Sequence, residues 1–215
     1  MFCPLRQIVS TALNVPAKTS NNMSKNFSPA TWCRSVCLFI VIAFTGLAAD
    51  LYTKHWTFQI LGMPGEYQAE TEPELRAVYW IWQDVFGIQT ALNLGALFGF
   101  GSGQTTLLVS FSLIFLAGIV GYLVLCAWRN LLLSAILGMI TAGICGNLYD
   151  RLGWHGLTNG EGQPIYAVRD WILCMIGTFQ WPNFNIADAL LVCSVVVLLI
   201  QELLCYNRGD RRNTN

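Results

Sequence analysis

The sequence predicts an all-α membrane protein with four transmembrane helices and a small extramembrane β-rich subdomain. Of its 215 residues, 54% are hydrophobic and only 11% are charged, whereas a soluble domain usually carries about 25% charged residues. Four apolar runs are each long enough, at about 20 residues, to cross a bilayer as a helix. A polar stretch between the first two runs contains an aromatic segment typical of strands. The formal net charge is zero, which gives no indication of a nucleic-acid partner.

The four predicted spans are residues 32–51, 105–128, 131–149 and 186–206. Only Arg129 and Asn130 separate the second span from the third, so these two are expected to form a tight helical hairpin. Residues 32–206 then form one membrane domain between two tails, 1–31 and 207–215. The first tail is rich in Ser, Asn, Thr and Pro and is expected to be flexible, without a cleavable signal peptide.

Two stretches, residues 55–104 and 151–185, are expected to lie outside the membrane. The first contains 78–88 (VYWIWQDVFGI), which favours strands, and its Trp and Tyr residues favour the membrane interface. A small sheet near the lipid surface is therefore expected, followed by a bendable interfacial segment at 95–103. The second stretch has a Gly-rich loop and then an apolar run, 171–181, which is too short to span and is expected to lie at the interface.

The basic residues predict the orientation in the membrane. Eight of the twelve Lys and Arg residues fall in the first tail and the start of the first span, the tight hairpin and the C-terminus. The other four are Lys54, just after the first span, and Arg76, Arg151 and Arg169 in the two extramembrane stretches. Because cytoplasmic segments carry an excess of Lys and Arg, both termini are expected in the cytoplasm and both stretches outside it. An even number of spans also places both termini on one side.

The eight cysteines are expected to pack mainly as small hydrophobic residues, because most lie in apolar runs. Cys33 and Cys37 lie one helical turn apart, but no histidine or second cysteine pair completes a zinc site. No metal and no cofactor are therefore expected.

Polar side chains gather at the predicted outer ends of the spans. Asn147 and Asp150, like Asn185 and Asp188, are three residues apart, which places each pair on one helical face. A carboxylate at the mouth of a membrane helix is costly and is by default a candidate functional residue. Asp188 lies at such a mouth, and Asp170 is in the stretch before it. Two neighbouring acids can share one proton, so that one takes a proton from water and the other donates.

Each of these groups also has an ordinary structural interpretation. Asp50 and Lys54 have the spacing of a helix-end ion pair, and Asp150 beside Arg151 could close the third span. Asp188 could offset the dipole of the fourth helix, and Asp170 could be a solvated loop residue. It is harder to explain all of them as incidental, because they gather at one membrane face.

The chain resembles the lipoprotein signal peptidase (signal peptidase II) family of four-helix membrane aspartyl proteases. The matching segments, in the family's order, are Asp50-Leu-Tyr-Thr-Lys54, Asn93-Leu-Gly-Ala-Leu-Phe98, Gly146-Asn-Leu-Tyr-Asp-Arg151, Val168-Arg-Asp-Trp-Ile172 and Phe184-Asn-Ile-Ala-Asp188. The stretch between Asp150 and Asp170 is longer than usual, with the Gly-rich 156–164 loop as the apparent insertion. Asp170 is favoured over Asp150 as the reactive partner because Val-x-Asp-aromatic-Ile fits the family's pattern.

The resemblance implies a catalytic dyad of Asp170 and Asp188. It implies that Asn93, Gly95, Asn147, Arg151 and Asn185 shape the substrate site, and that Asp50, Lys54 and Asp150 support the structure. The implied substrates are bacterial prolipoproteins whose lipobox cysteine carries diacylglycerol, cut just before that cysteine. We therefore expect a monomeric enzyme of the bacterial cytoplasmic (inner) membrane that contacts lipids and has its active site at the outer face.

Other mechanisms and functions fit the sequence less well. Serine or cysteine nucleophiles are disfavoured because His55 and His155 are the only histidines and no GxSxG motif occurs. A small proton- or ion-coupled carrier could use the same carboxylates as relay groups, but it would need polar residues at mid-span. Thr141 and Gly143 are the best candidates for that role. An assembly subunit without chemistry would leave the Asn/Asp pairs unexplained.

Overall fold

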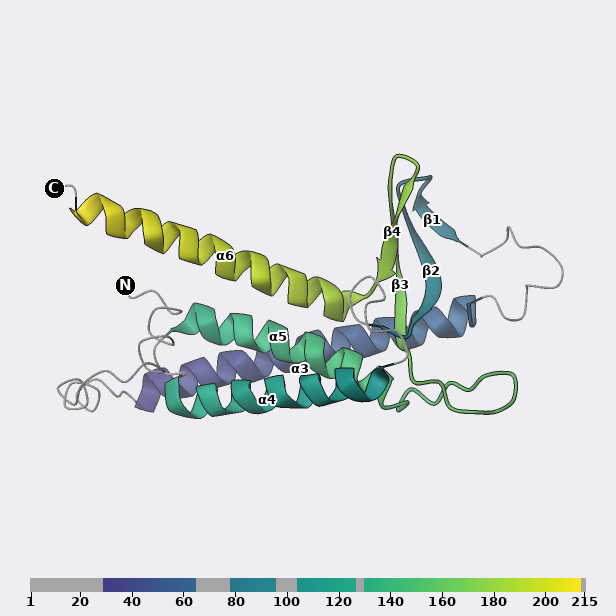
Figure 1. Cartoon of the computed structure of the whole chain (residues 1–215), viewed down its shortest axis with the longest axis horizontal. Coiled ribbons are helices and arrows are strands. Elements are labelled where there is room, and N and C mark those ends of the chain that lie inside the picture. Colours follow the sequence, from purple (N-terminus) through teal and green to yellow (C-terminus); the bar gives the residue numbers. More distant parts are fainter. Residues whose placement is uncertain (1–28, 65–77, 96–103, 127–129, 214–215) are drawn as a thin grey trace.

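The described part of the chain forms four long helices with a four-stranded antiparallel sheet at one end (Figure 1). In chain order the elements are α3 (Pro29–Leu61), β1 (Tyr79–Trp82), β2 (Phe86–Asn93), α4 (Thr105–Cys126), α5 (Leu131–Arg151), β3 (Val168–Ile176), β4 (Phe179–Phe184) and α6 (Ile186–Asn213). This computed structural model describes residues 29–64, 78–95, 104–126 and 130–213. Four of its helices are long and apolar enough to cross a membrane. The predicted fold class, four spans with a small β-rich subdomain, is therefore confirmed.

α5 is the central helix, because it packs against α3, α4 and α6. Half of its span is buried, against 6% of the α3 and α4 spans and 11% of the α6 span. Membrane helices approach closely where small residues face the partner. A Cβ added to Gly138 would lie 2.9 Å from the Phe39 carbonyl of α3, and one added to Gly143 would lie 2.6 Å from the Ala187 carbonyl of α6. The outer helices leave their apolar faces for lipid.

The sheet has the strand order β1-β2-β3-β4, so two hairpins lie side by side through the β2–β3 pair. The first hairpin turns at Asp84 (φ 56°) and the second at Gly177 (φ 62°), the left-handed conformation that tight turns require. The register of β2 with β3 places Ala91 opposite Asp170. Regular pairing is broken near this position, between Ile88 and Ala91 in the β2–β3 pair and between Ile172 and Cys174 in the β3–β4 pair. Such irregularities redirect side chains, which suits a site residue.

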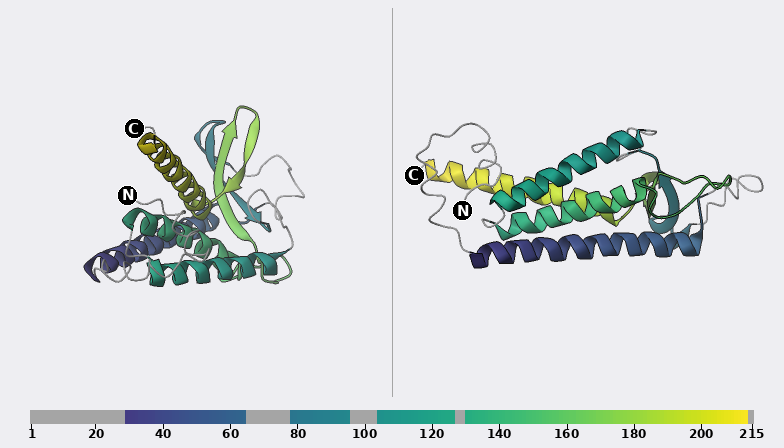
Figure 2. Two further views of the ribbon diagram at one scale, coloured as in Figure 1. Left: turned by 60° about the vertical axis from the view of Figure 1, so that its left-hand side comes forward. Right: turned by 90° about the horizontal axis from the view of Figure 1, so that it is seen from below.

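The strands run across the helix axes, at the end of the bundle where α3 ends and α6 begins (Figures 1 and 2). The start of α3 and the end of α6 lie at the opposite end. The strands and the ends of three helices therefore bring distant parts of the sequence to one place.

Several boundaries differ from the sequence expectation. α3 continues to Leu61, beyond the expected end at residue 51, because Asp50 and Lys54 are fully buried instead of marking the exit into water. The run 171–181 belongs to the β3–β4 hairpin, so the sheet is larger than the one expected from 78–88 alone. α6 stays helical to Asn213, past the expected end at 206. Residues 1–28 and 96–103 lie outside the described part of the chain.

Candidate active site

The sequence-predicted polar residues meet where the sheet joins the helices. The helix α3 contributes Asp50 and Lys54, and α5 contributes Asn147, Asp150 and Arg151. Asn185 directly precedes α6, and Asp188 lies in its first turn. Asn93 comes from β2, Asp170 comes from β3, and Gly95 follows β2. Each of these ten residues bonds to another member of the group. The four acids among them belong to two adjoining groups, the ion cluster and the dyad.

The ion cluster consists of Asp50, Lys54, Asp150 and Arg169. The Lys54 Nζ atom lies 2.7 Å from Asp50 Oδ2 and 3.3 Å from Asp150 Oδ2. Arg169 donates to Asp150 Oδ1 through Nη2 (2.8 Å) and Nε (3.1 Å), and its backbone N–H donates to Asp150 Oδ2 (2.9 Å). All four side chains are at most 4% exposed. Two acids and two bases balance, which is the usual condition for burying charge.

The cluster corrects one expectation and adds a residue. Asp150 does not pair with its neighbour Arg151 but with Arg169, nineteen positions along the chain. Arg151 instead donates from Nη2 to the Gly95 carbonyl at 2.7 Å, and Gly95 N–H donates to Asn93 Oδ1 at 2.9 Å. Sequence reasoning missed Arg169 as a site residue; its position directly before Asp170, at the start of a strand, was the available signal.

The dyad consists of Asp170 and Asp188, which Asn185 connects. Asp170 is 1% exposed, and its Oδ1 accepts from Asn185 Nδ2 at 2.6 Å while its Oδ2 accepts from Asn93 Nδ2 at 3.2 Å. Asp188 Oδ1 accepts from Asn147 Nδ2 at 2.8 Å. Asn185 Oδ1 in turn accepts from the Asp188 N–H at 2.9 Å.

The start of α6 explains how Asp188 is held. Asn185 precedes the helix, and its side chain accepts from the N–H of Asp188 three residues on. The Asp188 side chain reaches back to the Asn185 N–H at 3.4 Å. This reciprocal arrangement is a capping box, which satisfies two N–H groups that the helix itself cannot bond. The same local motif that starts the helix therefore also aims the acid.

The environment of Asp170 favours its protonated form. Burial first, and then the nearby charge of Asp188, raises the pKa of Asp170 from its ordinary value of 3.8 to about 7. The amide donors from Asn185 and Asn93 partly oppose this rise. Arg169 and Asp170 are adjacent in a strand, and successive side chains point to opposite faces, so Arg169 pairs with Asp150 and does not neutralise Asp170. A pKa near neutrality suits an acid that exchanges a proton.

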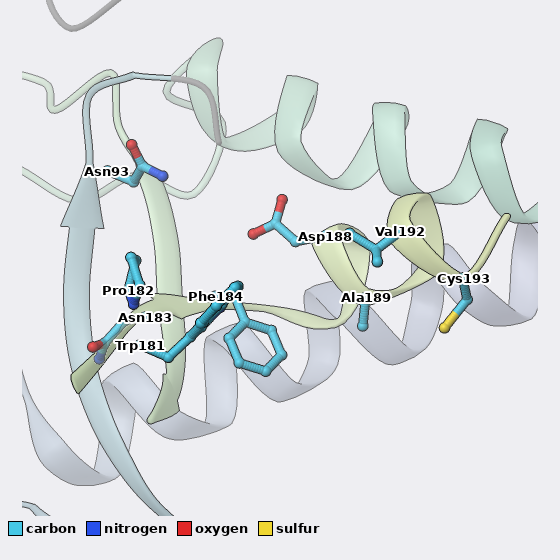
Figure 3. A pocket seen from close by; sticks show the side chains of 9 residues that line it. All are labelled: Asn93, Trp181, Pro182, Asn183, Phe184, Asp188, Ala189, Val192 and Cys193. Atoms are coloured by element: carbon cyan, nitrogen blue, oxygen red, sulfur yellow. The ribbon is translucent and has the colours of Figure 1, made fainter. Parts of the chain in front are cut away.

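A pocket of about 290 Å³ opens beside Asp188 (Figure 3). Of the polar residues described above, Asp188 and Asn93 line the pocket, and Asn93 bonds Asp170. The remaining lining comes from β4 and the first turns of α6 and is mainly apolar: Trp181, Pro182, Asn183, Phe184, Ala189, Val192 and Cys193. Within the described residues, no group of three or more His, Cys, Asp or Glu side chains is arranged to hold a metal ion. The arrangement is suited to acid–base chemistry on an apolar, extended ligand.

Comparison with known proteins agrees with this arrangement. A family model described as signal peptidase (SPase) II matches residues 42–204. The chain belongs to the signal peptidase II family. It is 43% identical over 167 residues to the lipoprotein signal peptidase of Rhodopirellula baltica, covering 77% of this chain and 71% of that one. It is 27% identical over 161 residues to the lipoprotein signal peptidase of Clostridium novyi, covering 75% and 94%.

A solved structure also resembles the chain. It is described as a bacterial membrane enzyme determined by the in meso method at 2.3 Å, with 26% identity and a TM-score of 0.58 over 80% of this chain and 90% of that one. Members of the signal peptidase II family are proteases of the aspartic type, so the expected enzyme class is confirmed. The comparisons do not support the alternative of an ion-coupled carrier.

Proposed function

We propose that this chain is an intramembrane aspartyl endopeptidase that removes the signal peptide from diacylglyceryl-modified prolipoproteins, cutting before the lipidated cysteine. The observation that carries the proposal is the Asn185 side chain, which bonds Asp170 through Nδ2 and the Asp188 backbone through Oδ1. It holds together two acids that are eighteen positions apart, beside an apolar pocket. Membership of the family, and relatives named lipoprotein signal peptidase, support the substrate class.

The proposed chemistry divides one proton between the two acids. Asp188, which borders the pocket, takes a proton from water as the water oxygen attacks the peptide carbonyl carbon. Asp170 gives its proton to the carbonyl oxygen, which produces a neutral tetrahedral diol. Asp188 then gives its proton to the leaving nitrogen, the carbon–nitrogen bond breaks, and a diol hydroxyl returns a proton to Asp170. Both acids end in their starting states, ready for the next substrate.

The surrounding residues have supporting roles in this proposal. Asn93, Asn147 and Asn185 position the two carboxylates through the amide bonds described above. Arg151 and Gly95 fix the end of β2, where the substrate enters. Asp50, Lys54 and Asp150 support the junction from the ion cluster.

The proposed location is the bacterial cytoplasmic membrane, with both termini in the cytoplasm and the dyad at the outer face. The positions of the helix ends support this topology, since α3 begins and α6 ends at the end of the bundle opposite the sheet. The apolar pocket between β4 and α6 suits a substrate that carries lipid, and we propose that the enzyme contacts membrane lipids and acts as a monomer.

The decisive test replaces each acid by its amide. Asp170→Asn and Asp188→Asn should each lower processing of a diacylglyceryl-modified lipobox peptide by about 100- to 10,000-fold, the usual contribution of general acid–base catalysis. The readout is cleavage per mole of enzyme in lipid-containing micelles. The matched control is Asp84→Asn, an exposed acid in the β1–β2 turn whose left-handed conformation asparagine tolerates.

Full processing by either dyad variant would remove the dyad from the mechanism. The same peptide without lipid should be cut poorly, and equal cleavage of the two would contradict the proposed substrate class. Addition of a chelator should leave activity intact.

A further inference from the structure

We propose that Lys54 is a positioning residue for the dyad, because it fixes the side-chain amide of Asn147 in the orientation that donates to Asp188. The inference rests on the proposed function and assigns to one member of the ion cluster a part in the reaction. It goes beyond structural support, since a purely structural lysine would need only its two acids.

The bonds of Lys54 show that a third contact leads out of the cluster. Its ammonium lies near Asp50 (2.7 Å) and Asp150 (3.3 Å), and it donates to Asn147 Oδ1 at 3.0 Å. An ammonium has three N–H donors and no acceptor. The ammonium thus has one oxygen partner for each of its three donors. The third partner is the side-chain oxygen of Asn147, whose NH₂ group donates to Asp188. The Lys54 side chain is fully buried, so water does not compete for these bonds.

The chemistry of an amide makes the orientation of Asn147 a two-way choice. Its oxygen accepts from Lys54 and from Asn185 Nδ2 (3.2 Å), and its nitrogen donates to Asp188 Oδ1 (2.8 Å). Rotation by half a turn would point the NH₂ group at the Lys54 and Asn185 donors and the oxygen at the carboxylate. All three bonds would then be lost.

Lys54 is the contact that keeps this choice constant through the reaction. Asp188 changes its protonation state during the proposed cycle, and a protonated carboxyl can either donate or accept. The Asn185 amide can itself rotate. The ammonium can only donate, so it holds the Asn147 oxygen throughout and leaves the NH₂ group aimed at Asp188.

The positive charge of Lys54 acts on the dyad as well. It partly opposes the rise in the pKa of Asp170 that burial and Asp188 cause. The other charged groups near Lys54 and the dyad are Asp50 on α3, Asp150 and Arg151 on α5, Arg169 on β3 and His155 in the loop after α5. Removal of the Lys54 charge should therefore make Asp170 hold its proton to higher pH.

The test compares two variants that differ only at Lys54. Asp50→Asn keeps the Lys54–Asn147 bond, and the double variant Lys54→Met with Asp50→Asn removes it while leaving the cluster electrically balanced by Asp150 and Arg169. Relative to Asp50→Asn, the double variant should lose about 10- to 100-fold in kcat, the value of a hydrogen bond to a charged group, with KM changed less than about threefold. Its pH range of activity should move toward higher pH, because Asp170 loses a nearby positive charge.

A merely structural role for Lys54 would lower activity at every pH without moving the range. If the double variant has the kcat and pH range of Asp50→Asn, the inference is wrong. Such a failure is distinct from failure of the proposed function, because Asp170→Asn and Asp188→Asn would remain inactive.

A second measurement keeps Lys54 in place and so does not depend on folding of the double variant. In the unsubstituted enzyme labelled with ¹⁵N in Lys and Asn side chains, the Lys54 ammonium and the Asn147 amide signals should move together as Asp170 titrates near pH 7. The Asn147 signal is assigned by its loss in Asn147→Asp. A Lys54 ammonium signal whose chemical shift stays constant through this titration would overturn the inference.

Discussion

The ion cluster and the dyad contain two acids each, lie at the same end of the bundle, and differ in their partners. Asp50 and Asp150 face the ammonium of Lys54 and the guanidinium of Arg169 at 2.7 to 3.3 Å. Asp170 and Asp188 face the amides of Asn93, Asn147 and Asn185 instead. Among the described residues, no ion pair includes either acid of the dyad.

The comparison shows that burial alone does not identify a catalytic acid. Asp150 and Asp170 are almost equally buried, at 0% and 1% exposure. Each acid of the cluster has a cation as its partner, Lys54 for Asp50 and Arg169 for Asp150. The dyad lacks this balance, because Arg151 bonds the Gly95 carbonyl and Arg169 pairs with Asp150. An amide orients a carboxylate without neutralising it, and one proton must then be shared.

Removal of one acid from each group should have unequal consequences for stability. Asp150→Asn leaves Lys54 and Arg169 buried with one acid between them, which should cost about 3 to 5 kcal/mol of unfolding free energy. Asp170→Asn removes a buried charge that has no cation, and at pH 7 should cost less than about 1 kcal/mol. Denaturant unfolding in detergent micelles measures both, with Asp84→Asn as the exposed control.

Equal losses of stability in Asp150→Asn and Asp170→Asn would contradict the division into a structural and a reactive group. An Asp150→Asn enzyme as stable as the unsubstituted protein would contradict the same division.

The ion cluster also requires a residue without a side chain at position 146 of α5, where the helix packs against Asp50. A Cβ on Gly146 would collide with the Asp50 carboxylate, whereas a Cβ on Gly118, in the middle of α4, would meet nothing within 4 Å. Gly146→Ala should therefore destabilise the fold by about 1 to 3 kcal/mol through overpacking. Gly118→Ala should be neutral or stabilising by up to about 1 kcal/mol, because alanine favours helix.

Thermal unfolding of the two glycine variants in the same micelles measures the contrast. A Gly146→Ala protein as stable as Gly118→Ala would mean that the cluster can move aside, and that its geometry is not fixed by packing.

Much of the fold could be predicted from the sequence because membrane spans depend on local composition. Four apolar runs gave the four helices, and the aromatic run at 78–88 gave the first hairpin. The second hairpin was harder, because β3 lies between two strands and is buried along most of its length, so its sequence lacks a polar face. The end of α3 was placed too early, because charges at residues 50 and 54 normally indicate an exit from lipid, and here they pair inside the protein.

The members of the site could be predicted, but its division into two groups could not. Spacing shows that Asn147 and Asp150 share a helical face. It does not show that Asn147 bonds Asp188 of the dyad while Asp150 pairs with Lys54 and Arg169 in the ion cluster. The partner of Asp150 depends on the β2–β3 pairing and on which face of the strand Arg169 occupies. Those are tertiary facts, and the local proximity of Arg151 favoured the wrong partner.

The pH dependence of stability and activity should separate the two groups most finely. The pKa of Asp170 in the folded protein, about 7, is above its ordinary value of 3.8. The folded state thus binds a proton that the unfolded state releases, and this contribution to stability is complete below pH 3.8 and is lost as pH rises through about 7. The unfolding free energy should fall by up to about 1.4 kcal/mol per pH unit within that window.

Asp170→Asn should remove this slope, while Asp84→Asn should keep it. Activity should likewise fall about tenfold per pH unit above pH 7, because the proposed reaction needs the shared proton. Unfolding at pH 5 and pH 8, together with kcat/KM measured between pH 5 and 9, tests both statements. If the slope persisted in Asp170→Asn, the shared proton would belong to another group, and the contrast between the balanced cluster and the unbalanced dyad would lose its chemical meaning.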